Sequence, residues 1–172
     1  LEKQSVLSPF DFLSIFDLLD ASERIYDLLS EKKEYFHLND DALDLNPVVT
    51  LKRSISSMIE SDGTVSDNAS SKLRDVRSKI RETRRDLTNI MNTYRNRYST
   101  SLSSDVIALK GGQEALPVKL SCKGSVKGAT IGYSSTGETV FIVPYEVIDL
   151  QNHLSSLLQE EQDEIVKVLH DL

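Results

Sequence analysis

The stretch from Asn68 to Tyr98, NASSKLRDVRSKIRETRRDLTNIMNTYRNRY, decides the fold of this chain. Its apolar or near-apolar residues follow one another at steps of four and three. They are Ala69, Leu73, Val76, Ile80, Thr83, Leu87, Ile90, Tyr94 and Tyr98. A period of about 3.5 residues is typical of the seam of a coiled coil. Because one narrow apolar stripe does not support a helix of this length alone, the pattern predicts a partner helix.

A suitable partner begins at Pro144, a residue that favours the first turn of a helix. Its stripe again has steps of three and four. The stripe consists of Val147, Leu150, Leu154, Leu157, Glu161, Ile165, Val168 and Leu172. Residues 144–172 hold seven acids and one lysine, whereas residues 72–100 hold nine bases and three acids. Opposite charges on neighbouring helices favour pairing, and the pair must be antiparallel because the intervening segment returns the chain.

The segment between these helices has the pattern of a small antiparallel sheet. Gly111 and Gly112 are a turn pair typical of β-hairpins, and they lie between apolar runs at 106–109 and 115–120. Pro117 predicts that the second run lies at a sheet edge or contains a bulge. Two more strands are predicted at residues 129–133 and 138–142, and together they form a second hairpin.

The region before Asn68 is predicted to be helical. Ser8 and Pro9 favour the start of a helix that runs to about Ser30, and a second short helix ends at Asp62-Gly63. Between them, the acid-rich residues 31–46 predict a short helix at most, followed by a loop. We therefore expect an α+β, mainly α chain with a long antiparallel helix pair, a small antiparallel sheet at its tip and a helical N-terminal core. The expected divisions are 1–64, 65–100, 101–143 and 144–172.

Composition excludes several classes of protein. The 172 residues include one Cys, so neither a disulfide scaffold nor a Cys-based zinc site is encoded. No apolar run approaches the roughly 18 residues that span a bilayer, and no signal peptide is recognised, so a cytoplasmic protein without a membrane partner is expected. The first residue is Leu1 rather than Met, so we expect a piece of a longer protein.

The sequence contains no convincing catalytic or cofactor-binding constellation. The histidines at 37, 153 and 170 are unrelated in position, and no phosphate-binding Walker loop is present. The acids Asp40, Asp41 and Asp44 lack the spacing of a calcium loop. Cys122 lies near lysines, but a plain surface or strand cysteine is the better interpretation. The chain is therefore expected to be non-catalytic, without cofactor or metal.

Basic residues around the predicted sheet are the candidate contact site. Four lysines fall within or beside its strands, and two arginines end the preceding helix. These candidate nucleic-acid-binding residues are Lys110, Lys119, Lys123, Lys127, Arg95 and Arg97. Such a group attracts phosphates without reading base sequence. The alternative is that the basic helix only pairs with the acidic one, which offsets both charges.

Four segments resemble the MutS-II branch of the MutS-like ATPases. Val6–Pro9 is similar to a segment that lies early in the family's proteins. Residues 59–70, IESDGTVSDNAS, are similar to a signature of the family. Residues 116–119, LPVK, resemble a family strand, and residues 134–144, SSTGETVFIVP, resemble a serine-rich motif. Asn152 matches one Asn of a pair in the helix that follows. The motifs occur in the family's order and together extend over nearly the whole chain.

This resemblance implies a core, lever and clamp fragment of a larger protein. Two long lever helices would carry the β-rich clamp, while the parent's ATPase and small nuclease domains lie outside these residues. The implied parent uses ATP and Mg, forms a homodimer, clamps branched or duplex DNA and suppresses homologous recombination. A ribosome or ribosomal RNA is an alternative partner, for a rescue factor of collided ribosomes. A second alternative is a prefoldin-like coiled-coil chaperone or interaction module.

Overall fold

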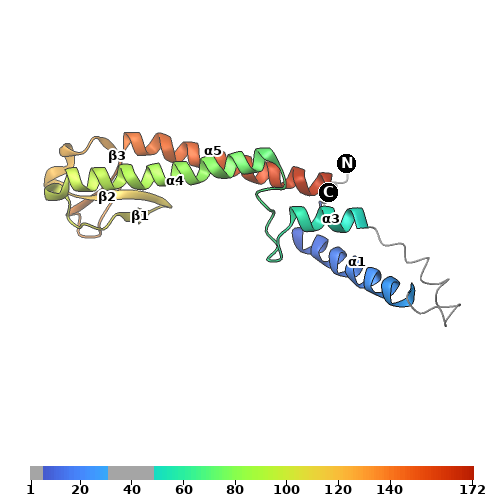
Figure 1. Ribbon diagram of the computed structural model, residues 1–172. Coiled ribbons are helices and arrows are strands. Elements are labelled where there is room, and N and C mark those ends of the chain that lie inside the picture. Colours follow the sequence, from blue (N-terminus) through green and yellow to red (C-terminus); the bar gives the residue numbers. More distant parts are fainter. Residues whose placement is uncertain (1–5, 31–48) are drawn as a thin grey trace, which may run out of the picture. The chain divides into compact units, whose positions relative to one another are not determined.

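The computed structural model describes residues 6–30 and 49–172 (Figure 1). Its internal contacts define two compact units. The first contains the chain up to Asp75 together with Glu161–Leu172, and the second is Val76–Glu160. The predicted loop with Asp40, Asp41 and Asp44 lies outside the described residues. The predicted domain scheme, with divisions after 64, 100 and 143, stays a prediction.

The first helix of the first unit, α1, spans Pro9–Ser30, as its start signal predicts. Ser8 and Asp11 form a reciprocal cap. The Asp11 amide donates to Ser8 Oγ at 3.3 Å, and the Asp11 carboxylate accepts from the Ser8 amide at 2.8 Å and from its hydroxyl at 2.7 Å. These bonds hold the pKa of Asp11 below its usual value. The cap satisfies amide groups that a helix start otherwise leaves unpaired.

Lys52 joins α1 to the second helix, α3, which spans Val49–Met58. Its ammonium lies 2.5 Å from Asp20 and 2.5 Å from Glu23, and 5.5 Å from the centre of the Phe16 ring. The hydrogen bond from Lys52 lowers the pKa of Asp20, and the two carboxylates raise the pKa of Lys52. The same three charges therefore fix α3 against the inward face of α1.

A tight turn at Gly63 leads from α3 to the start of the first long helix, α4, which spans Ser71–Arg97. On either side of the turn, Ile59 and Val65 form an antiparallel bridge and are both buried. Ser70 then caps α4, because its hydroxyl accepts the Leu73 amide at 2.9 Å. The same hydroxyl donates to the buried carboxylate of Glu164 at 2.8 Å.

Glu164 lies on α5, which spans Tyr145–Asp171. The two long helices of 27 residues each pack along the predicted stripe. In the second unit, Val76 and Ile80 of α4 form a buried cluster with Leu157 of α5. Nearer the sheet, Leu87 and other α4 residues pack with the start of α5, so the helices run antiparallel, as Figure 1 shows. No helix in the described part of the chain is both long and apolar enough to cross a membrane.

Four antiparallel strands form the sheet of the second unit, in the order β1-β2-β4-β3. They are β1 (Ala108–Lys110), β2 (Gln113–Lys119), β3 (Gly128–Tyr133) and β4 (Thr139–Pro144). The predicted turn between β1 and β2 is confirmed. Gly111 has φ 56° and Gly112 has φ 81°, the positive angles that a type I′ turn requires.

Pro117 lies in β2, an interior strand whose pairings show no register shift, so the prediction of an edge strand or a bulge is wrong for β2. Its carbonyl nonetheless accepts the Ser103 amide at 2.8 Å. Since a strand residue directs its N and C=O to the same side, the missing amide of Pro117 faces away from β4. On that side of β2 the neighbouring strand is β1, and Ala115 is the last β2 residue that pairs with it. Strand β1 is therefore no longer opposite Pro117. Proline is tolerated there because no strand requires its N–H.

The sheet packs on α4 and α5 through a cluster that contains the strand residues Leu116, Val118, Val140 and Ile142, all at most 1% exposed. Between β2 and β3 the chain forms a short 3₁₀ segment, η2, spanning Leu120–Ser125. At the start of β3, Gly128 lies so close to β4 that a Cβ there would come within 2.2 Å of the Val143 carbonyl oxygen. The approach of these strands therefore depends on a missing side chain.

Gly128→Ala is expected to destabilise the chain by roughly 1–3 kcal/mol, because the added methyl group forces β3 away from β4. Urea unfolding followed by circular dichroism measures this change. Gly132→Ala in the same strand is the matched control, since a Cβ at Gly132 meets no atom within 4 Å. Equal losses for the two variants would contradict the close approach at Gly128.

Lys52→Met is expected to lower the thermal midpoint at neutral pH, because Asp20 and Glu23 lose their shared cation. The lowered pKa of Asp20 contributes stability above its unfolded value, near pH 4, and that contribution is lost as pH falls through the folded value. The raised pKa of Lys52 contributes stability below its unfolded value, near pH 10, and that contribution is lost as pH rises through the folded value.

The difference in midpoint between the native chain and Lys52→Met is therefore largest between about pH 5 and about pH 9 and shrinks on acidification. Thermal melts across this range measure it. Arg53→Met, on the exposed neighbour, is the control. A difference that is independent of pH would mean that Lys52 acts through packing alone.

Candidate nucleic-acid interface

Lys119 and Lys123 lie at one end of the sheet. Lys119 ends β2, and its ammonium donates to the Thr100 carbonyl at 3.0 Å. Lys123, in η2, donates to the Tyr133 hydroxyl at 2.9 Å and lies 5.4 Å from the centre of that ring. Within the described residues, neither ammonium group forms an ion pair with a carboxylate, and each is held by an uncharged acceptor. Register explains the location, since Lys119 pairs with Thr139 and Tyr133 pairs with Val140.

Lys110 and Lys127 come from the opposite end. Lys110 ends β1 beside the start of β2, and its ammonium lies 4.7 Å from the centre of the Phe141 ring. Lys127 precedes β3 and is exposed. Strands of six or seven residues span roughly 20 Å. The prediction that the four lysines form one group is therefore wrong, because strand direction divides them between two ends.

Arg95 and Arg97 occupy the last turn of α4, where cations interact favourably with the helix dipole. Arg97 is exposed and Arg95 is half-buried. The α4 C-terminus is continuous with the segment that contains Thr100, so the two arginines lie on the Lys119 side of the sheet. Four of the six predicted cations lie on the same side of the sheet; they are Arg95, Arg97, Lys119 and Lys123. The other two, Lys110 and Lys127, belong to the opposite end by their positions in the backbone.

Two of the tyrosines are unavailable for stacking on nucleic-acid bases. Tyr94 and Tyr98 stack on each other at 5.9 Å between ring centres and pack against the main core. Burial and the Glu146 carboxylate raise the pKa of Tyr94. Tyr133 is 52% exposed and is positioned by Lys123. It can therefore stack on a base beside a cation.

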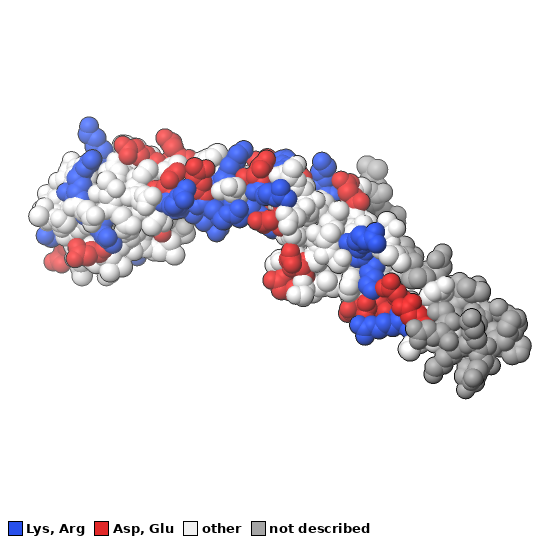
Figure 2. Space-filling view, viewed as in Figure 1, with Lys and Arg blue, Asp and Glu red and all other residues white. Residues whose placement is uncertain are grey.

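A basic face on α4 was not among the predicted site residues. It consists of Arg77, Arg81, Arg84 and Arg85, which share one side of the helix by their spacing. Figure 2 shows Lys and Arg gathered along this helix, whereas those on the sheet are scattered. Arg77 and Arg81 have interactions within the structure. The side chains of Arg84 and Arg85 are exposed and form no ion pair with any residue of the described part.

The signal for this face was present in the sequence, because the spacing of four, three and one places all four arginines together on a helix. Arg81, Arg84 and Arg85 on the face, and Lys119 and Lys123 at the sheet, are exposed cations. Exposed cations attract the phosphates of a polyanion and do not discriminate bases.

The chain matches no protein-family profile. It is 31% identical to "Endonuclease MutS2" of Clostridium tetani (strain Massachusetts / E88) over 100% of its length. It is 30% identical to the protein of that name from Clostridium botulinum (strain Okra / Type B1) over 98% of its length, and 30% identical to that of strain Eklund 17B / Type B over 99%. It is related to the MutS2 proteins. The chain spans 22% of the length of each of these relatives.

The MutS2 relationship agrees with the resemblance in the sequence motifs, which extends through both units. The relatives are named as endonucleases, and the matched region is about a fifth of each. Within residues 6–30 and 49–172, no group of three or more His, Cys, Asp or Glu side chains is placed to hold a metal ion.

Proposed function

We propose that this chain is the lever and clamp module of a MutS-II-type protein and that it holds DNA, branched or duplex, through phosphate contacts. The observation that carries the proposal is the row of arginines on α4, of which Arg84 and Arg85 are exposed and free of ion pairs within the described residues. The group around Lys119 and Lys123 continues this basic character at one end of the sheet.

The lever part of the proposal rests on the two long helices. Each is about 40 Å long at 1.5 Å per residue. In the proposed module, this helix pair carries a displacement along its length. In the proposed parent, an ATPase with bound ATP and Mg, acting as a homodimer, supplies this displacement. The module itself has no catalytic step, and the parent suppresses homologous recombination by clamping DNA.

Binding to DNA is expected to fall steeply with salt, with a slope of about −0.9 per phosphate contacted. Fluorescence anisotropy of the chain with a labelled four-way junction and with a plain duplex, between about 50 and about 200 mM salt, measures the slope. The double variant Arg84→Gln/Arg85→Gln is expected to weaken binding on both DNAs and to reduce the slope by about 1 to 2. Lys119→Gln/Lys123→Gln is expected to act in the same direction.

Arg53→Gln/Lys167→Gln removes the same charge from exposed positions of the first unit and is the matched control. Equal losses in the control would show that only net charge matters and would contradict a defined interface. Salt-independent binding, or none, would contradict the DNA proposal. A structured RNA hairpin that competes more strongly than the junction would favour the ribosome as substrate.

A further inference from the structure

One aromatic side chain of the second unit is exposed beside a cation. In the described part of the chain, three rings have a lysine ammonium between 4.7 and 5.5 Å from their centres; they are Phe16, Phe141 and Tyr133. Phe141 is buried and Phe16 is half-buried. Tyr133 is 52% exposed, and it ends β3, an edge strand of the sheet. Its ring is therefore accessible to a ligand.

The hydrogen bond from Lys123 holds this ring in place without covering it. The ammonium lies 2.9 Å from the Tyr133 hydroxyl oxygen and 5.4 Å from the ring centre. The longer distance is close to the sum of the hydrogen bond and the fixed separation between the hydroxyl oxygen and the ring centre. The ammonium therefore lies beyond the edge of the ring and does not occupy either of its faces.

The backbone around Tyr133 leaves room for a planar ligand. Gly124 follows Lys123 in η2, and Gly137 lies in the turn that joins β3 to β4. A Cβ at either of these glycines, or at Gly132, would meet no atom within 4 Å. The surface on these sides of the ring is therefore open to the approach of a flat base.

Lys119 supplies a second fixed cation at the same end of the sheet. Its ammonium is held by the Thr100 carbonyl at 3.0 Å. Lys119 and Tyr133 pair with neighbouring residues of β4, the strand that lies between theirs. Two strand spacings place the backbones of Lys119 and Tyr133 about 10 Å apart. A base on the ring thus has one cation at the ring edge and another further along the strand.

An acid, Glu138, opposes these cations. Its carbonyl accepts the Leu120 amide at 2.8 Å, which places Glu138 at this end of the sheet. The side chain is exposed, and within the described residues it forms no ion pair with Lys119 or Lys123. The two lysines and the exposed Arg97 outnumber this carboxylate, so phosphate is still attracted to this end.

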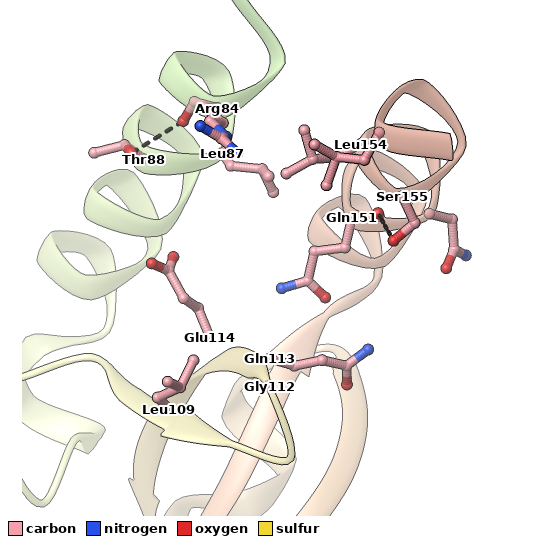
Figure 3. Close-up of a pocket in the computed structure, with 12 residues that line it drawn as sticks. Arg84, Leu87, Thr88, Leu109, Gly112, Gln113, Glu114, Gln151, Leu154 and Ser155 are labelled. Atoms are coloured by element: carbon pink, nitrogen blue, oxygen red, sulfur yellow. Dashed lines mark hydrogen bonds between the residues drawn. The ribbon is translucent and has the colours of Figure 1, made fainter. Parts of the chain in front are cut away.

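A groove elsewhere in the second unit lacks these features. It lies between α4, α5 and the β1–β2 hairpin and has a volume of about 530 Å³ (Figure 3). Among the described residues that line it, none is aromatic, and the charged ones, Arg84 and Glu114, have opposite signs. The groove offers a base neither a ring nor a uniform charge, so Tyr133 is the better stacking site.

Stacking on Tyr133 requires a base that is free of its neighbours. In a duplex, both faces of each base are covered by adjacent base pairs, so paired DNA presents only its phosphates to this end of the sheet. In a single strand, a base can separate from its neighbours and cover the ring. Because every base has an aromatic face, such a contact tolerates any base sequence.

We propose that the end of the sheet formed by Lys119, Lys123 and Tyr133 is a subsite for an unpaired nucleotide. The base stacks on Tyr133, and the adjoining phosphates lie at Lys123 and Lys119. This inference rests on the proposed function and deepens it. The α4 arginines hold the phosphates of any strand, whereas this subsite selects single-stranded segments, such as those at a branch or a gap.

Fluorescence anisotropy of the 172-residue chain with three labelled DNAs tests the subsite. The DNAs are a paired duplex, the same duplex with a short dT gap, and a dT oligonucleotide. The native chain is expected to bind the gapped duplex more tightly than the paired one. Tyr133→Leu is expected to weaken binding to the gapped duplex and to dT by about tenfold, and to leave binding to the paired duplex unchanged.

Tyr133→Phe is the matched variant, since it removes the hydrogen bond with Lys123 but keeps the ring, and it is expected to retain most of the binding to dT. Tyr145→Leu is the control, because Tyr145 is 61% exposed but begins α5 at the opposite end of the sheet. A dT oligonucleotide that contains one 2-aminopurine reports stacking directly. Its fluorescence is expected to be quenched by the native chain and by Tyr133→Phe, but not by Tyr133→Leu.

Two results with Tyr133→Leu would overturn the subsite. One is an equal loss on paired and gapped DNA, and the other is no loss on any DNA while binding to the duplex remains, which would leave the proposed function standing. A loss in Tyr133→Phe as large as in Tyr133→Leu would also overturn stacking.

The same titrations separate the subsite from the proposed function. Binding to dT that depends on Tyr133, without binding to the paired duplex, would support the subsite and contradict the holding of duplex DNA. The absence of binding to all three DNAs would overturn both. Tighter binding of oligo-U than of dT, again dependent on Tyr133, would support the stacking subsite and assign its ligand to single-stranded RNA.

Discussion

The structure depends on the seam between α4 and α5. Neither helix is apolar enough to be stable alone, so each requires the other to cover its stripe. Each unit holds its own part of this seam. In the second unit Val76 and Ile80 meet Leu157, and in the first unit Leu73 packs with Val168 and Leu169. At the start of α4, Ser70 both caps the helix and donates to the buried Glu164, so one hydroxyl joins local helix geometry to helix pairing. The sheet has no core without the seam, because its inner face packs on the same two helices.

Features governed by local chemistry were predictable from the sequence. The start of α1 at Pro9, the glycine turn at 111–112 and the long periodic helix follow from capping, positive φ and spacing, which act within a few residues. Prediction failed where a neighbouring strand decides the outcome. Pro117 favours a sheet edge or a bulge, but it lies in an interior strand whose outer neighbour, β1, has ended before it. That arrangement depends on the length of β1, which nothing near Pro117 encodes.

The candidate site was less predictable than the fold. The four lysines lie within a stretch of 18 residues of the sequence. Antiparallel strands nevertheless place residues that are close in sequence at opposite ends of the sheet, and this separates the lysines into two pairs. The arginine face of α4 was within reach of helical spacing.

The ends of the second unit have a consequence for how such a module arises and how it can be exchanged. Val76 and Leu157, close to its two ends, belong to one small cluster, so the chain enters and leaves the unit through adjacent points of a helical hairpin. An element inserted between two neighbouring points of a scaffold does not require the scaffold to rearrange. The sheet can therefore diverge, shorten or be transplanted onto another antiparallel helix pair as a cassette, provided that the two joining helices keep their register.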